Sequence, residues 1–135
     1  TPNAVGLAGL GAGVDFVLSA GLESIQAHER GLTKLLIEGL SGVPGAVVYG
    51  PRDAEKQCAV VSFNLEDWNP SDLSFRLDEE FGILTRVGLH CAPSAHKTIG
   101  TFPGGTVRVS MGYLNTENEI AKALEVIETL ARERR

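Results

Sequence analysis

The sequence has 135 residues, of which 43% are hydrophobic and 21% charged, and a formal net charge of −5 at pH 7. That length is typical of a single domain and is enough to bury a core. The acidic balance argues against nucleic acid as the main partner, because phosphate binding requires a basic surface, and no apolar stretch approaches the roughly 20 residues that a membrane-spanning helix needs.

Two helices are predicted in the first 40 residues. The chain opens at Thr1-Pro2-Asn3 without a methionine, so we expect a piece of a longer protein. Residues 4–20 are apolar on almost every side, with glycines interspersed. This favours a buried helix over a dinucleotide-binding loop, which would need a strand before it. Gly21 is expected to end this helix. Residues 22–40 carry apolar residues at helical spacing, which predicts a second helix with His28 on its solvent side.

The middle of the chain changes to a strand-like pattern. The apolar runs 47–49 and 58–63 predict two strands joined by a polar hairpin connection, with Cys58 as a small buried hydrophobic residue. Asn69-Pro70 is typical of a helix start, and the helix is expected to run to Phe81.

Two more strands and a last helix complete the prediction. The strands are expected at 83–87 and 106–110, and Thr116 with Glu119 forms a capping box that begins an amphipathic helix. The order predicts an α+β fold with a small, largely antiparallel sheet covered on one face by helices. We expect residues 1–135 to form one domain.

Residue types that can carry chemistry gather in the window 85–115. Cys91 follows the third predicted strand and lies on a loop, and a reactive cysteine needs exposure and nearby cations. His90 is its neighbour in sequence. From these residues alone, Cys91 is either a nucleophile or an incidental thiol.

Arg108 lies between Val107 and Val109 on a predicted strand, so it points away from both. A guanidinium there needs an anionic partner, because burying it unpaired is costly. The partner is either a bound carboxylate or an internal Asp or Glu.

Metal binding and secretion are not expected. His90, Cys91 and His96 offer ligand atoms, but no second pair of ligands closes a tetrahedral site. Two cysteines do not make a disulfide framework, and no signal-peptide pattern is present. We therefore predict a cytoplasmic protein without a metal.

Three separated motifs resemble one family. The motifs are Arg86-x-Gly88-x-His90-Cys91-Ala92, Thr106-Val107-Arg108-x-Ser110 and Asn115-Thr116-x-x-Glu119. In this order and spacing they look like the C-terminal signature of cysteine desulfurases and related class V aminotransferases. The resemblance implies the C-terminal small domain of a fold-type I pyridoxal-phosphate enzyme.

The resemblance also implies roles for four residues. Cys91 matches the cysteine that takes sulfur from L-cysteine as a persulfide, and Arg108 matches the arginine that binds the substrate carboxylate. Arg86 matches a second arginine near the active site, whose role is less defined. Thr1 matches a threonine that reaches the cofactor phosphate of the other subunit in a homodimer.

Lys97 lies in Ser94-Ala95-His96-Lys97, which imitates the motif around the cofactor lysine of this superfamily. Too little of the chain follows Lys97 to complete the small domain, so we expect the cofactor lysine upstream and the chain alone to be inactive. A sulfur-acceptor protein is an expected partner. The alternatives are a selenocysteine lyase, a transaminase, or a stand-alone non-enzymatic α+β module.

Overall fold

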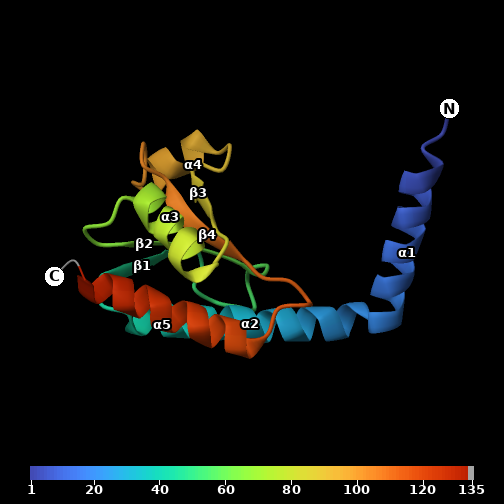
Figure 1. Ribbon diagram of the computed structural model, residues 1–135, viewed down its shortest axis with the longest axis horizontal. Coiled ribbons are helices and arrows are strands. Elements are labelled where there is room, and N and C mark those ends of the chain that lie inside the picture. The colour runs from blue at the N-terminus through green and yellow to red at the C-terminus, as the bar shows by residue number, and fades with distance from the viewer. Residues whose placement is uncertain (134–135) are drawn as a thin grey trace.

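The computed structural model describes residues 1–133 of the chain. Within them lie five helices and four strands, in the order α1 (Ala4–Ala20), α2 (Leu22–Gly42), β1 (Ala46–Tyr49), β2 (Val60–Leu65), α3 (Pro70–Phe81), β3 (Arg86–Gly88), α4 (Pro93–Thr98), β4 (Thr106–Ser110) and α5 (Glu117–Glu133). The predicted α+β fold is confirmed (Figure 1).

The four strands form one sheet in the order β1-β2-β4-β3, and all three pairings are antiparallel. Phe63 of β2 is paired with Val48 of β1 and with Val107 of β4, and Val107 is paired with Val87 of β3. Because paired residues share a face of the sheet, this row of apolar side chains marks the core side.

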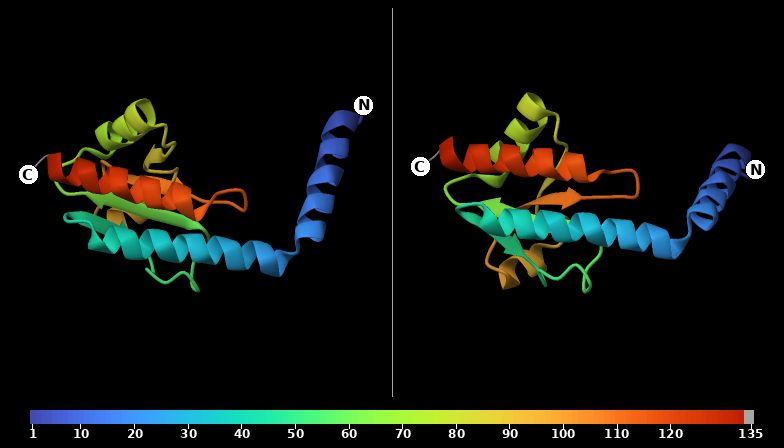
Figure 2. Two further views of the ribbon diagram at one scale, coloured as in Figure 1. Left: turned by 60° about the horizontal axis from the view of Figure 1, so that its bottom comes forward. Right: turned by 90° about the horizontal axis from the view of Figure 1, so that it is seen from below.

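Helices α2, α3 and α5 pack on that core side, so the prediction that helices cover one face is confirmed. Helices α2 and α5 lie side by side over this face of the sheet (Figure 2). The side chains that close the core are fully buried and come from the helices and the two central strands: Leu32, Leu36, Leu40, Val61, Phe63, Leu73, Leu77, Val107, Ile127 and Leu130. The short α4 lies at the end of the molecule away from α2 and α5 (Figure 1).

Local sequence signals define the helix ends. Asn69 caps α3 by accepting a hydrogen bond from the Ser71 backbone N–H, and Gly82 ends that helix in the left-handed conformation. At α5, the Thr116 N–H donates to the Glu119 carboxylate at 2.8 Å, and the Glu119 N–H donates to the Thr116 hydroxyl at 3.3 Å. This is the predicted capping box.

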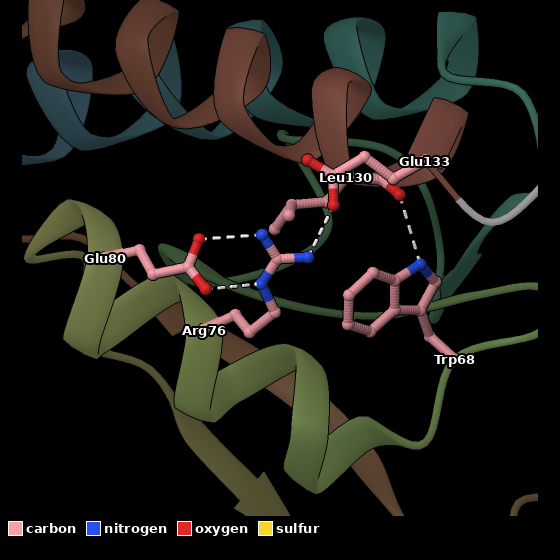
Figure 3. A network of polar contacts seen from close by, with 5 residues as sticks. All are labelled: Trp68, Arg76, Glu80, Leu130 and Glu133. Carbon is pink, nitrogen blue, oxygen red and sulfur yellow. Dashed lines mark hydrogen bonds and ion pairs between the residues drawn. The ribbon is translucent and has the colours of Figure 1, made fainter.

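A polar network joins α3 to α5 (Figure 3). Arg76 on α3 forms an ion pair with Glu80 on the same helix and with Glu133 on α5. Trp68 lies beneath the guanidinium and donates a hydrogen bond to the Leu130 carbonyl at 3.2 Å. The hydrogen bonds that Arg76 donates to the carboxylates of Glu80 and Glu133 raise the pKa of Arg76. The network fixes the two helices relative to each other on the core side of the sheet.

Helix α1 differs from its predicted environment. Gly21 ends it as expected, but none of its residues is buried within this chain, and the predicted burial is therefore wrong here. The helix projects away from the sheet (Figure 1), with Phe16 against Tyr113 as an aromatic contact. Among the described residues no single helix has both the length and the apolar character of a membrane span. Helices α1 and α2 taken together are long and apolar enough, but the chain bends by 80° between them.

Two predicted side-chain environments are also wrong. Cys58 is exposed, because the β2 ladder begins only at Val60 and leaves Cys58 outside it. His28 is partly buried, because its Nε2 atom lies 2.8 Å from the Asn115 carbonyl oxygen, which brings the segment before α5 over the helix. The third strand is shorter and later than predicted, and α4 falls where the sequence indicated only a loop.

Candidate functional site

The sheet face opposite the core carries two arginines side by side. Arg86 of β3 is the direct cross-strand partner of Arg108 of β4. The same row continues through Ser62 of β2 to Tyr49 of β1. Like charges placed directly opposite each other on a sheet are destabilising, so an anion bound between them would stabilise this pairing.

No such anion comes from the described part of the chain. None of the ion pairs among residues 1–133 involves Arg86 or Arg108, and the internal salt bridge considered for Arg108 is absent from that range. The Nε atom of Arg108 is buried without a hydrogen-bond partner. Residues 81–116 contain no Asp or Glu at all. The face is therefore suited to an anion from outside this segment.

Cys91 lies exposed on the loop after β3, as predicted. Both His90 and Cys91 have positive backbone φ angles, of 49° and 61°. Such a conformation is uncommon for residues other than glycine and turns the chain back sharply. The turn brings the Cys91 sulfur to 4.0 Å from the Nη2 atom of Arg86. An exposed thiol beside a guanidinium matches the surroundings of reactive cysteines.

His90 anchors the other side of this turn. Its Nε2 atom lies 3.3 Å from the hydroxyl oxygen of Thr106, at the start of β4, and its Nδ1 atom is buried without a partner. Burial, followed by the charges of Arg108, His96 and Arg86, lowers the pKa of His90. A neutral imidazole therefore lies next to the two arginines at pH 7.

His96 forms a second layer behind His90. It is buried, its ring centroid is 5.8 Å from that of His90, and its Nδ1 atom is 2.7 Å from the Thr101 hydroxyl. Helix α4 and the loop after it are thus packed onto the turn that carries Cys91.

Glycine is required where β3 and β4 approach each other. Gly105 has a φ of 79°, and a Cβ atom there would lie 2.3 Å from the backbone of Gly88. Only glycine allows this contact. The contact holds the end of β3, and so the Cys91 turn, against the start of β4.

Two other residues of interest lie outside this cluster. Thr1 is exposed at the far end of α1, away from the sheet (Figure 1). Lys97 is exposed on α4 with its Nζ atom 5.1 Å from the centre of the Phe102 ring. The described residues contain no group of three or more His, Cys, Asp or Glu side chains that could hold a metal ion.

Sequence reasoning missed how these residues support one another. It found Arg86, Cys91 and Arg108 as separate candidates but not the cross-strand pairing of the two arginines or the contact between His90 and Thr106. The absence of acidic residues from 81 to 116, in a chain of net charge −5, is a sequence signal that could have pointed to this face.

Comparison with known proteins identifies the family of the chain. Residues 1–123 match the aminotransferase class-V family. A probable cysteine desulfurase of Methanothermobacter thermautotrophicus is 38% identical over 132 residues, which are 97% of this chain and 32% of the relative. A probable cysteine desulfurase of Halalkalibacterium halodurans is 39% identical over 128 residues, which are 93% of this chain and 30% of the relative. The chain thus spans about a third of the length of these curated relatives.

Solved structures give the same result. The apo structure of a cysteine desulfurase from Thermococcus onnurineus superimposes with a TM-score of 0.91 at 38% identity, over 98% of this chain and 32% of that one. The cysteine desulfurase CsdA (S-sulfonic acid) from Escherichia coli gives a TM-score of 0.84 at 25% identity, over 98% of this chain and 31% of that one. By sequence and by structure, the chain belongs to the aminotransferase class-V family.

Proposed function

We propose that this chain is the C-terminal, sulfur-accepting part of a pyridoxal-phosphate-dependent cysteine desulfurase, which converts L-cysteine to alanine and leaves the sulfur as a persulfide on Cys91. One observation carries the proposal: an exposed thiol and two guanidinium groups, neither with an acidic partner among residues 1–133, meet at one sheet face, within a segment free of acidic residues. The relatives that align over nearly the whole chain are named cysteine desulfurases, which supports it.

Arg108 has the properties of a carboxylate-binding group. It extends from a paired strand, which restricts its position, and its buried Nε atom has no hydrogen-bond acceptor within residues 1–133. The planar guanidinium can donate two parallel hydrogen bonds to a carboxylate. In this role Arg108 holds the α-carboxylate of L-cysteine and orients its side chain along the sheet face.

Cys91 supplies the nucleophile. Its thiolate attacks the sulfur of the bound cysteine, so that a new S–S bond forms while the substrate Cβ–S bond breaks. The electron pair of the broken bond stays with the substrate carbon skeleton, which leaves as alanine after protonation. Pyridoxal phosphate, when bound, supplies the electron sink that makes the Cβ–S bond labile. A persulfide on Cys91 can then be passed to a sulfur-acceptor protein.

The described residues fit the cofactor only in part. Thr1 offers an exposed hydroxyl of the kind that binds phosphate, but it lies at the far end of α1 from Arg108 (Figure 1). One copy therefore cannot bring both residues to one site, which supports a homodimer in which Thr1 serves the other subunit. Lys97 of α4 contacts Phe102 in the loop after that helix, and we place the cofactor lysine upstream of this chain. We expect the chain alone to be inactive and the whole enzyme to be cytoplasmic.

The test uses the full-length protein loaded with pyridoxal phosphate. After incubation with L-cysteine, mass spectrometry of the Cys91 peptide should show an added sulfur atom, and alanine should appear in solution. The Cys91→Ser variant should release no alanine, whereas Cys58→Ser should behave as the wild type. Alanine release that does not depend on Cys91 would indicate a lyase for a more labile substrate such as selenocysteine. No alanine at all would indicate transamination.

A further inference from the structure

We propose that the two arginines divide the anions of the site between them: Arg86 stabilises the thiolate of Cys91, while Arg108 takes the substrate carboxylate. The inference deepens the proposed function and rests on Cys91 as the nucleophile. It gives Arg86 a defined chemical role at the reacting sulfur.

The geometry separates the two arginines. The Arg86 Nη2 atom lies 4.0 Å from the Cys91 sulfur, and no hydrogen bond among residues 1–133 joins Arg108 to that sulfur. The separation arises locally. Cys91 is five residues beyond Arg86, and the left-handed conformations of His90 and Cys91 fold the loop back toward the end of β3.

The charges around Cys91 favour the anion. The titratable or charged groups on the adjacent elements are Arg86 on β3, His90 on the turn, Arg108 on β4, and His96 and Lys97 on α4. No carboxylate lies on any of these elements. Helix α3, which also packs against β3 and β4, carries Asp72, Asp78, Glu79 and Glu80, but it lies on the core side of the sheet, opposite the face with Arg86 and Arg108. His90 is kept neutral by burial and by both arginines, so it adds no positive charge. Arg86, in contact with the sulfur, is therefore the dominant cation for the thiolate.

A charge count supports the division. Two guanidinium groups that face each other across β3 and β4 repel, and they have no internal acidic partner among the described residues. A thiolate on Cys91 together with a substrate carboxylate supplies two negative charges for these two positive ones. The sheet face is thus electrically balanced only when nucleophile and substrate are both in place.

The test measures the thiolate without turnover. The full-length protein, with no L-cysteine added, is pulsed with iodoacetamide at a series of pH values, and labelling of the Cys91 and Cys58 peptides is read by mass spectrometry. A unit charge at 4 Å in water-like surroundings changes the thiolate equilibrium about fivefold. We therefore expect the midpoint of Cys91 labelling to move up by about 0.7 pH unit in Arg86→Gln. Arg86→Lys should shift it less, because the charge remains.

Cys58 and Arg132→Gln provide the controls. Cys58 is exposed on another part of the chain and should label with the same midpoint in every variant. Arg132 pairs with Glu128 on α5, a helix that does not carry Cys91, so Arg132→Gln should leave the Cys91 midpoint unchanged. An unchanged Cys91 midpoint in Arg86→Gln would overturn the inference, as would equal shifts in Arg86→Gln and Arg86→Lys. Failure of the proposed function is a separate outcome, because a Cys91 midpoint that depends on Arg86 can coexist with the absence of a persulfide after incubation with L-cysteine.

Discussion

Replacing Arg108 by Gln should weaken substrate binding without weakening the fold. In the full-length enzyme we expect KM for L-cysteine to rise about ten- to a hundredfold, since a hydrogen bond to a charged group contributes about 1.5–3 kcal/mol. Gln keeps part of the side-chain stem and two amide hydrogens but cannot supply the charge or the planar fork. The rate at saturating L-cysteine should change less than KM, because Cys91, the proposed nucleophile, and its contact with Arg86 are unaltered.

The stability expectation comes from the sheet register. Arg108 directly faces Arg86, and opposed like charges cost roughly 0.2–1 kcal/mol. The described residues give Arg108 no ion pair to lose, and its Nε atom is already buried without a partner. The melting temperature of Arg108→Gln should therefore equal or exceed that of the wild type.

Two measurements on one preparation distinguish a substrate-binding role of Arg108 from a structural one. Steady-state alanine release gives KM, and a thermal unfolding scan gives the melting temperature, with Arg132→Gln as the surface control on α5. An unchanged KM would refute carboxylate binding by Arg108. A melting temperature several degrees below that of the wild type, with KM unaffected, would show that the arginine is structural and that the reasoning from the unpaired Nε atom is wrong.

Three further outcomes test the scaffold of the site. Gly105→Ala should lower the unfolding free energy by about 2 kcal/mol or more, because the new Cβ meets backbone at 2.3 Å in a left-handed conformation, whereas Gly112→Ala, with open space around it, should change it by less than about 0.5 kcal/mol in urea titrations. Thr116→Ala should remove the α5 cap at a cost of about 1 kcal/mol and speed hydrogen exchange in the first turn of that helix. Since the pKa of His90 lies below its ordinary value of 6.5 in the folded state, the unfolded chain takes up the proton first as the pH falls. The unfolding free energy should therefore rise with pH up to about 6.5, and His90→Gln should flatten that slope; an unaltered slope in the variant would contradict it.

The elements that were predicted well are those with local signals. The capping box at Thr116 and the apolar face of the last helix lie within a few turns of sequence, and both appear in the structure as expected. Gly21 likewise ends the first helix. Such signals depend on neighbouring residues alone, so a single sequence contains all that is needed to interpret them.

The features that were predicted poorly depend on contacts between distant residues. The place of Cys58 follows from where the β2 ladder begins, and a shift of two residues moves it out of the sheet. The environment of His28 follows from Asn115, which no local pattern links to it. The apolar composition of α1 indicates a helix that can be buried, but composition alone does not identify the surface against which the helix packs. The pairing of Arg86 with Arg108 is likewise a property of strand register.

The overall charge of the chain and the charge of its candidate site have opposite signs, and the difference follows from the range of electrostatic interactions. At physiological ionic strength the charges of exposed groups are screened over about 8 Å. The acidic residues of α5 lie on the core side of the sheet. Residues 81–116 contribute no Asp or Glu to the opposite face, which carries Arg86 and Arg108. A small anion between Arg86 and Arg108 therefore experiences the two guanidinium groups and little of the −5 net charge. A nucleic acid would extend over a much larger area and meet the acidic surface as well. The same sequence thus disfavours a polyanion, while its fold pairs two guanidinium groups in a way that suits a small anion such as a carboxylate.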